Sequence, residues 1–458
     1  MTVCDGTTDR TRVGDKMDPS SFYDAYLDVY SPERFVEFYT SLEEELFLRA
    51  NPSRPIPFSQ VPIVLAPEFE SRFVQMVSLL WKVLGNPVYQ ELSAQSIPEP
   101  LRPPSERANP PVIPFDPDHN IGCIDLHLDG SALRMIEFMV LPPGCVGVYP
   151  GMLEHYGSYL STVLPDREPT SFRAGWDRER CEEVMVSQIV GAGEPERVAI
   201  IDWEPKSQVT YGEFCYTLDM LWRKRGIPGV IADPREIRTQ DGRILAKDLP
   251  VDRILNRLTL LDWGARHDEI EPYSRILWES PEVFAYHPYL WYLGDKVSLT
   301  LLSDPATLGK MGLSSSEVER MTSLVPRTQP LASFCRDGAP LVDADRLLEF
   351  FGSPSSIVLK PLSSHGSKGI IFGPTDTPTK KALEQALLRI DPNEYAAMEY
   401  VPTPEIEVPR GGGERETWHS DLRIFVLNSH YVFPGGRVYF GDYTNQVPCR
   451  GFAPLFFA

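Results

Sequence analysis

The sequence has few cysteines for its length, and they show no arrangement typical of a structural role. The seven cysteines among 458 residues are scattered, odd in number and without a C-x-x-C spacing: Cys4, Cys123, Cys145, Cys181, Cys215, Cys335 and Cys449. A disulfide framework or a structural zinc site needs paired or clustered cysteines. We therefore expect reduced thiols, mostly in the core, and a reducing compartment.

Positive charge and long apolar segments are also scarce. The chain has 44 Lys and Arg against 64 Asp and Glu, a formal net charge of −20, whereas binding a nucleic acid or an anionic membrane needs a basic face. The sequence contains neither a transmembrane-length apolar segment nor an apolar start of the signal-peptide type. These absences predict a cytoplasmic protein without a nucleic-acid or membrane partner. A nucleotide is still compatible, because it needs only a few local cations.

The apolar pattern that is present predicts an α+β protein. Residues 31–49 and 67–85 have helical spacing. A strand at 197–203, an amphipathic helix ending at Gly226 and a strand at 227–234 predict a β-α-β crossover of a parallel sheet. A chain of 458 residues is too long for one small core, so we expect two or three lobes.

A loop rich in glycine and serine separates two predicted strands, at 355–360 and 369–372. Glycines let backbone N–H groups approach a polyanion closely, and Lys360 and Lys368 supply positive charge. The loop is therefore a candidate phosphate-binding segment. The alternative is an ordinary hairpin loop with solvated lysines.

The segment 121–140 predicts a hairpin that brings two carboxylates together. A three-residue loop at 130–132 sets Asp125 directly opposite Glu137, with side chains ~5 Å apart. Two facing carboxylates repel, so a cation should lie between them, and Mg²⁺ is a suitable one beside a nucleotide phosphate. The alternatives are a one-residue change of register or a nearby arginine that pairs with one carboxylate. The residues leave both interpretations open.

The predicted strand 396–401 ends at Pro402. The backbone N–H and C=O groups of such a strand end can bind an adenine without a particular side chain. We therefore consider this segment a candidate adenine site.

A second hairpin is predicted near the end of the chain. Asp421 and Arg423 share one face of a strand, and a loop at 428–430 would bring Arg437 opposite Asp421. An arginine held by a carboxylate can steady a transferred phosphoryl group, because its fork binds phosphate oxygens in a bidentate way. The alternative, a structural cross-strand salt bridge, is about as common.

One further lysine, Lys296, follows an acidic residue at a predicted helix start. Taken alone it carries no functional signal, because most such lysines are solvated surface residues.

Taken in order from about residue 55 to 458, these segments resemble the ATP-grasp ligases in their circularly permuted form, the group that includes glutathionylspermidine and trypanothione synthetases. In that group an Asp and a Glu separated by eleven residues hold Mg²⁺, and Asp125 and Glu137 match them in type and spacing. "VLKP…GSKGI", "MEYVP" and "DLR…GGR" resemble the phosphate lysine and loop, the adenine hinge and the closing strands. The resemblance implies an ATP-grasp fold with a Rossmann-like parallel α/β lobe.

The resemblance also implies roles and domain boundaries. It places the ATP phosphates on Lys296, Lys360, Ser364, Gly366, Ser367, Lys368 and Gly369, adenine on Glu399, Tyr400 and Val401, phosphoryl transfer on Arg423 and Arg437, and Mg²⁺ on Asp125 and Glu137. It divides the chain into a disordered arm (1–20), an N-terminal lobe with the metal-binding hairpin (21–190), a Rossmann-like substrate lobe (191–285) and an ATP-binding lobe (286–458).

Two positions depart from the group's pattern. Met139 stands where the group has an Asn ligand to the metal, and a thioether is a poor ligand for a hard cation. Cys123 stands where the group has an Arg that contacts the acyl phosphate. Asn445 or Asp442 could replace the missing oxygen ligand.

The resemblance implies an ATP- and Mg²⁺-dependent ligase that joins a small-molecule carboxylate to an amine, such as an amino acid, a peptide or a polyamine, through an acyl phosphate. The alternatives are a homologue that binds nucleotide without catalysis and a kinase that stops at the phosphorylated substrate. The sequence names neither the acid nor the amine, and it leaves the oligomeric state open.

Overall fold

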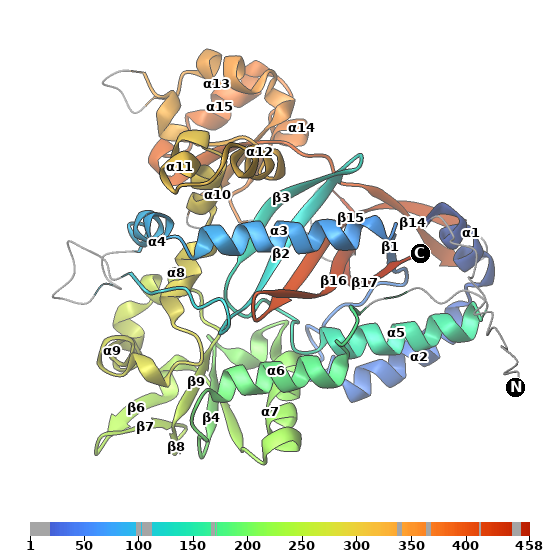
Figure 1. Cartoon of the computed structure of the whole chain (residues 1–458), viewed down its shortest axis with the longest axis vertical. Coiled ribbons are helices and arrows are strands. Elements are labelled where there is room, and N and C mark those ends of the chain that lie inside the picture. The colour runs from blue at the N-terminus through green and yellow to red at the C-terminus, as the bar shows by residue number, and fades with distance from the viewer. Residues whose placement is uncertain are drawn as a thin grey trace, which may run out of the picture.

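A seven-stranded sheet forms the centre of the protein (Figure 1). The computed structural model describes residues 19–97, 102, 112–165, 170, 172–336, 341–362, 368–411, 414–441 and 450–458. The sheet order is β1 (Ile63–Leu65), β17 (Arg450–Phe457), β16 (His430–Tyr439), β15 (Glu414–Leu427), β2 (Ile121–Asp129) and β3 (Ala132–Met139), with β14 (Glu405–Gly411) paired to β15. Only the short pairing of β1 with β17 is parallel in this sheet.

Both predicted hairpins form, but each has a two-residue turn rather than the expected three-residue loop. In the first, Asp129 pairs with Ala132, and the register shifts at a bulge so that Asp125 pairs with Glu137. In the second, Leu427 pairs with His430, and a bulge restores the pairing of Asp421 with Arg437. A bulge adds one residue to one strand. The expected pairs are therefore confirmed, although the turns that were expected to produce them are wrong.

The second turn shows why two residues suffice. Asn428 and Ser429 both have positive φ, 50° and 56°. Two central residues of positive φ give a tight turn whose twist matches that of the flanking strands. Asn tolerates this backbone region better than most residues.

Helices cover both faces of the large sheet. Phe73 of α3 (Glu68–Leu84) packs against Tyr431, and Tyr149 of α5 (Tyr149–Val163) packs against Phe425 and Phe433. Val426 is the cross-strand partner of Tyr431 and is adjacent to Phe425 in the chain, so the two aromatic groups lie on opposite faces. The face under α5 is the one that carries Asp421 and Arg423.

The predicted β-α-β crossover is confirmed. A parallel sheet has the order β5 (Gly229–Ala232), β4 (Val198–Ile201) and β9 (Arg253–Asn256), with α7 (Tyr211–Arg225) linking β4 to β5. The helix ends at Gly226, whose φ of 67° suits a residue without a side chain. A small antiparallel sheet of β6 (Ile237–Gln240), β7 (Arg243–Ala246) and β8 (Leu249–Val251) follows β5 in the chain.

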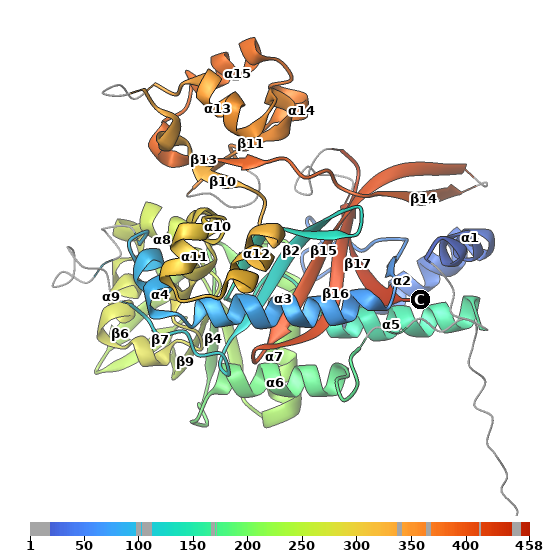
Figure 2. The same ribbon diagram turned by 45° about the horizontal axis from the view of Figure 1, so that its top comes forward.

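A third antiparallel sheet has the order β10 (Thr328–Pro330), β13 (Tyr395–Glu399), β11 (Ile357–Pro361) and β12 (Ile371–Phe372). Figure 2 shows it with α13 (Ala344–Phe351), α14 (Gly373–Asp376) and α15 (Lys380–Leu387) as a layer above the large sheet. The strands predicted on both sides of the glycine- and serine-rich loop are thus β11 and β12, which pair with each other.

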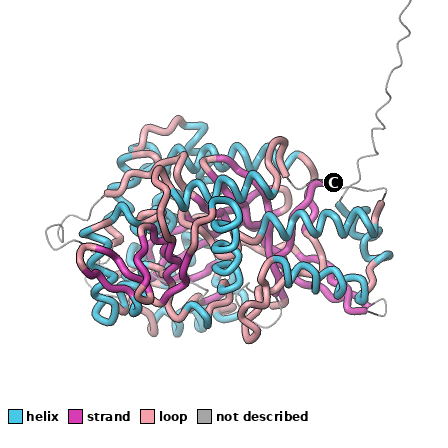
Figure 3. Tube along the Cα trace, turned by 90° about the horizontal axis from the view of Figure 1, so that it is seen from below, coloured by secondary structure: helices cyan, strands magenta, loops and turns pink. Residues whose placement is uncertain are grey.

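The remaining helices surround the sheets (Figure 3). The α-helices are α1 (Pro19–Val29), α2 (Pro32–Glu45), α4 (Pro87–Ala94), α6 (Arg178–Val190), α8 (Leu260–Ala265), α9 (Glu271–Glu279), α10 (Lys296–Leu302), α11 (Pro305–Lys310) and α12 (Ser315–Leu324). The 3-10 helices are η3 (Pro205–Ser207), η4 (Pro234–Glu236), η5 (His267–Ile270), η6 (Pro281–Val283), η7 (Pro288–Gly294), η8 (Leu331–Phe334), η9 (Pro354–Ser356) and η10 (Pro392–Glu394). Within the described ranges, no helix combines the length and the apolar character that a membrane crossing requires.

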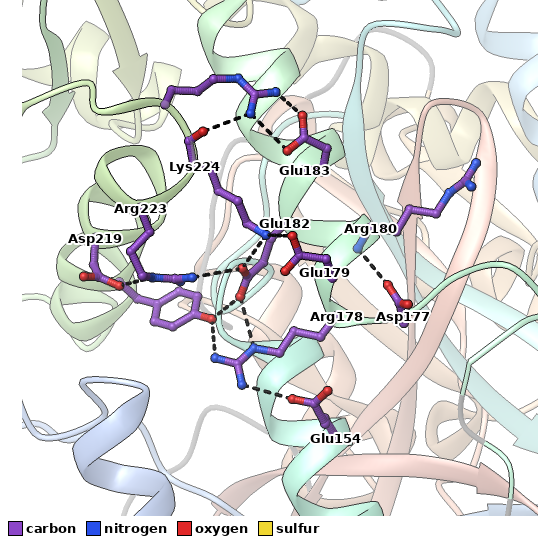
Figure 4. A network of polar contacts seen from close by, with 12 residues as sticks. Glu154, Asp177, Arg178, Glu179, Arg180, Glu182, Glu183, Asp219, Arg223 and Lys224 are labelled. Atoms are coloured by element: carbon purple, nitrogen blue, oxygen red, sulfur yellow. Dashed lines mark hydrogen bonds and ion pairs between the residues drawn. The ribbon is translucent and has the colours of Figure 1, made fainter.

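A polar network joins α5, α6 and α7 (Figure 4). Glu182 of α6 is buried and pairs with Arg178, Arg223 and Lys224, and it also accepts a hydrogen bond from the hydroxyl of Tyr216. Burial alone would raise the pKa of Glu182, but these partners lower it. Because a buried carboxylate without partners is costly, the network fixes the relative positions of the helices.

Buried apolar residues form three clusters. The largest surrounds the seven-stranded sheet and includes residues from 293–325, the second surrounds the parallel sheet, and the third lies within the four-stranded sheet. The predicted ATP-binding lobe, 286–458, therefore contributes to more than one core. The expectation of mostly buried cysteines is confirmed among the residues described: Cys123, Cys145 and Cys181 are buried, and Cys215 and Cys335 are partly buried.

Replacement of Gly294 by Ala should destabilise the protein and displace the start of α10. A Cβ atom there would lie 2.7 Å from the carbonyl oxygen of Phe138 and 2.8 Å from Cα of Met139. Such overpacking costs about 1–3 kcal/mol of unfolding free energy, which urea denaturation measures.

The matched control is Gly309→Ala in α11, where an added Cβ meets nothing within 4 Å. It should be neutral or stabilising by up to about 1 kcal/mol, because Ala favours a helix over Gly. An equal change in unfolding free energy for the two variants would contradict close packing of η7 against β3.

Candidate functional site

Two aspartates and two arginines form a buried cluster across β2, β15 and β16. The Asp125 carboxylate accepts two hydrogen bonds of 2.7 Å from Nε and Nη2 of Arg423. It accepts a third, of 2.9 Å, from Nη2 of Arg437, whose Nε and Nη2 also donate to Asp421 at 3.0 and 2.7 Å. The arginine alternative considered for Asp125 is therefore confirmed, as is the expected pairing of Asp421 with Arg437.

Burial controls the charges of this cluster. The Asp125 side chain is only 3% exposed and that of Asp421 1%. Burial alone would raise the pKa of Asp125, but Arg423 and Arg437 lower it to about 2. Burial raises the pKa of Asp421, which has one arginine rather than two as a hydrogen-bonding partner. The cluster is a structural unit in which each charge depends on its neighbours.

Lys360 lies at the junction between the four-stranded sheet and the first hairpin. Its ammonium group donates to the carbonyl oxygen of Ile136 at 3.2 Å. Ile136 is the extra residue of the bulge in β3, so this carbonyl lies at an irregular point of the ladder. Burial lowers the pKa of Lys360 to about 8, Glu137 opposes the shift and Lys296 adds to it.

Lys296 is buried, so the alternative of a solvated surface lysine is wrong. It begins α10, where Asp295 caps the helix, and its ammonium group lies 3.5 Å from Glu137. The Glu137 side chain is 40% exposed, so Glu137 is the accessible carboxylate of the facing pair, whereas Asp125 is enclosed. Burial raises the pKa of Asp295 to about 6.

The predicted adenine segment is connected to the same hairpin. The carbonyl oxygen of Val401 lies 2.9 Å from Nδ1 of His127, and the N–H of Tyr400 donates to Ser356. The Glu399 carboxylate pairs with Arg134 at 3.0 Å and with Arg327 at 3.5 Å. Because two arginines already bind the Glu399 carboxylate, this side chain is a poor candidate for binding adenine. An adenine bound at this segment would contact the remaining backbone groups.

His127 and Arg134 were not among the sequence candidates. His127 is buried, and burial lowers its pKa to about 4. It shares a face of β2 with Asp125 by the period of two, a signal that could have identified it. Arg134 offered no such signal, because its partner Glu399 is 265 residues away.

Several predicted residues lie outside the described ranges: Ser364, Gly366 and Ser367 of the loop, and Asn445 and Asp442 near the end. Lys368 and Gly369, the last two residues of the predicted loop, are described. Gly369 has a φ of 74°, and its carbonyl oxygen accepts a hydrogen bond from the Tyr395 hydroxyl. No group of three or more His, Cys, Asp and Glu side chains gathers as a metal site in the residues that the structure places. The assigned roles in binding ATP and Mg²⁺ stay predictions.

Comparison with solved structures identifies proteins of similar fold. The structure of a glutathione synthetase-like effector, GSS30, from Globodera pallida matches with a TM-score of 0.53 at 12% identity, covering 97% of this chain and 98% of that one. The chain has a glutathione synthetase-like fold. A putative gamma-glutamylcysteine synthetase from Methylobacillus flagellatus KT matches at 13% identity over 74% of this chain and 80% of that one, with a TM-score of 0.42.

Sequence comparisons add no relative: neither a scan of known protein families nor a search of curated proteins gives a match. At this identity the likeness supports the α+β fold, and the circular permutation stays a prediction.

Asp125→Asn should lower the free energy of unfolding by about 3–5 kcal/mol, because it leaves two buried guanidinium groups with one carboxylate. Chemical denaturation measures this. Glu137→Gln is the control: its partly exposed ion pair should be worth about 1 kcal/mol or less. A larger loss for Glu137→Gln than for Asp125→Asn would contradict the assignment of Asp125 as the structural carboxylate.

Proposed function

We propose that this protein is an ATP-dependent ligase that joins a carboxylate to an amine through an acyl phosphate. The glutathione synthetase-like fold supports a ligase of this kind. The observation that carries the proposal is that two lysines from different elements meet neighbouring residues of β3: Lys296 of α10 lies 3.5 Å from the Glu137 carboxylate, and Lys360 of β11 donates to the carbonyl oxygen of Ile136. Two ammonium groups in a largely desolvated place are unfavourable alone and favour a polyanion between or beside them.

The proposed reaction has two steps. A carboxylate oxygen of the acid substrate attacks the γ-phosphorus of ATP, and ADP leaves. The amine nitrogen then attacks the acyl carbon, inorganic phosphate leaves and the nitrogen gives up a proton. Phosphorylation is needed because oxide is a very poor leaving group.

The chain's own residues supply binding and charge in this scheme. Lys360 and Lys296 hold the phosphates, the backbone of Glu399, Tyr400 and Val401 lies beside the adenine, and Arg437 faces the transferred phosphoryl group. Fixed positive charge at the phosphates lowers the barrier because it is in place before the reaction. The proposed substrates are small: an amino acid, a peptide or a polyamine-like amine.

Mg²⁺ fits the predicted ligand set poorly. Both Asp125 oxygens already accept hydrogen bonds from arginines. On the same face of the hairpin, Cys123 and Met139 offer only sulfur, and burial raises the pKa of the Cys123 thiol to about 12. Mg²⁺ prefers oxygen ligands. Among the described members of this set, Glu137 is the one accessible to such a cation.

The same observation favours a second candidate, a homologue that binds nucleotide without catalysis. In that case the sulfur side chains and the enclosed aspartate mark a site that has lost its metal. A third candidate is a kinase that stops at the phosphorylated acid, but no observation favours it.

A screen of amino acids, peptides and polyamines for ADP release tests the proposal. A ligase releases ADP only when both the acid and the amine are present, and mass spectrometry finds the amide. Release of ADP with the acid alone, together with a stable acyl phosphate, would indicate a kinase. Nucleotide binding without ADP release under any combination would support the second candidate.

Lys360→Ala should weaken ATP binding about 10- to 150-fold, since a charge-assisted hydrogen bond is worth about 1.5–3 kcal/mol. Calorimetry measures the affinity. The control is Lys380→Ala at the start of α15, a partly exposed lysine paired with Asp345. An unchanged affinity for Lys360→Ala would remove Lys360 from the site.

ATP affinity should fall as the pH rises through about 8. The pKa of Lys360 is lowered to about 8 by burial, in the neighbourhood of Glu137, Lys296 and Asp125. Only the protonated ammonium attracts phosphate, so affinity is full below this pKa and is lost above it, by at most about tenfold per pH unit for one group.

Lys360→Arg should remove this dependence between pH 7 and 9, because a guanidinium group stays protonated. Calorimetric titrations across this range, in the same buffer series, compare the two proteins. The same slope in both would assign the pH dependence to another group.

A further inference from the structure

The guanidinium groups of Arg423 and Arg437 are fixed by three strands. Both carboxylates that hold them, Asp125 and Asp421, are buried, and the exposed fractions of the arginine side chains are 8% and 13%. The cluster contains two positive and two negative side chains, so its charge is balanced internally. Its positive groups are therefore held in position before any ligand arrives.

The directions of the hydrogen bonds leave N–H groups of each guanidinium group for a ligand. All five hydrogen bonds that these arginines make to described residues use Nε and Nη2. Nη1 of each group has no such bond in the described part of the chain. Asp125 and Asp421 use both hydrogens of Arg437 Nη2, so Arg437 keeps the two N–H groups of Nη1, which can donate charge-assisted hydrogen bonds to an oxyanion.

The lysines and the cluster act on a common neighbour. The pKa of His127 is lowered first by burial, then by Lys360 and Arg437. His127 lies on β2 two residues from Asp125 and contacts the carbonyl oxygen of Val401 at 2.9 Å. The two groups also meet at the same hairpin: Lys360 donates to the carbonyl oxygen of Ile136, next to Glu137, and Glu137 pairs with Asp125, the carboxylate that binds Arg437.

The hairpin has no room for a hard cation beside Asp125. A carboxylate has about four lone-pair sites, and arginine N–H groups use three of those of Asp125. A divalent cation there would also face two guanidinium groups at hydrogen-bonding distance from the same oxygens, a strong repulsion in a buried place.

We propose that Arg437, held with Arg423 by Asp125 and Asp421, takes the place of a hairpin-bound Mg²⁺ and forms with Lys360 a subsite for a polyphosphate that needs no divalent cation. This inference rests on the proposed nucleotide site and makes it metal-independent. The preformed guanidinium N–H groups donate to the phosphate oxygens, in the place where a metal ion would bind them in a site built from free carboxylates. The sulfur side chains at positions 123 and 139 agree with it, because no hard cation has to be held there.

Calorimetric titration with inorganic tripolyphosphate and with ATP, each in EDTA and in excess Mg²⁺, tests the inference. Tripolyphosphate should bind with dissociation constants that agree within about threefold under the two conditions. Arg437→Gln should weaken its binding in EDTA at least about tenfold, and Arg437→Lys should weaken it less.

The matched control is Arg415→Gln on the neighbouring strand β15, which removes a 42% exposed arginine whose carboxylate partner, Asp24, is 3.9 Å away. It should leave the affinity unchanged. Thermal melting of each variant identifies any that fail to fold, in which case Arg437→Lys decides.

Other results overturn the inference. Binding of tripolyphosphate only in Mg²⁺, lost in Glu137→Gln, would show that the hairpin holds a cation. Absence of tripolyphosphate binding under both conditions would also reject the subsite, even if the protein turns over ATP. Metal-independent binding without amide formation from any substrate pair would leave the subsite in place and reject the ligase.

Discussion

The enclosure of the Asp125 carboxylate by two guanidinium groups is the interaction on which the centre of the structure depends. Asp125 belongs to β2, Arg423 to β15 and Arg437 to β16, so one carboxylate connects three neighbouring strands. A buried ion pair is weak evidence of net stability, but removal of one partner is costly. Any other pairing of these strands that separates the four charged side chains is therefore less stable, because it leaves buried charges without partners.

Two β-bulges place the cluster and the lysines in register. Without the bulge in β3, the tight turn at Gly130 would pair Asp125 with Ile136 rather than with Glu137. A shift of one residue moves every side chain to the other face. The bulge also directs the carbonyl oxygen of Ile136 to Lys360. One irregularity thus sets both the carboxylate pairing and the contact between two sheets.

The candidate site combines a rigid part with an accessible part. The cluster of two aspartates and two arginines is enclosed, whereas Glu137 is partly exposed and Lys360 has a lowered pKa. The glutathione synthetase-like fold brings these parts together from segments that begin at β2 and end at β16. An anionic ligand that binds the lysines would therefore meet arginine side chains that the sheet already holds in position.

The sequence alone determined the local elements and the facing pairs. The periods of 3.6 and 2 predicted α3, α7 and the parallel crossover of β4 and β5. The pairs of Asp125 with Glu137 and of Asp421 with Arg437 were predicted from three-residue loops, and they form through two-residue turns with bulges instead. Only the tertiary structure decided that Arg423 and Arg437 both bind Asp125, that Lys296 is buried and that Arg134 holds Glu399. The physical reason is distance along the chain: the turn and bulge residues act locally, whereas Asp125 meets its arginines 298 and 312 residues away through sheet pairing that no local pattern encodes.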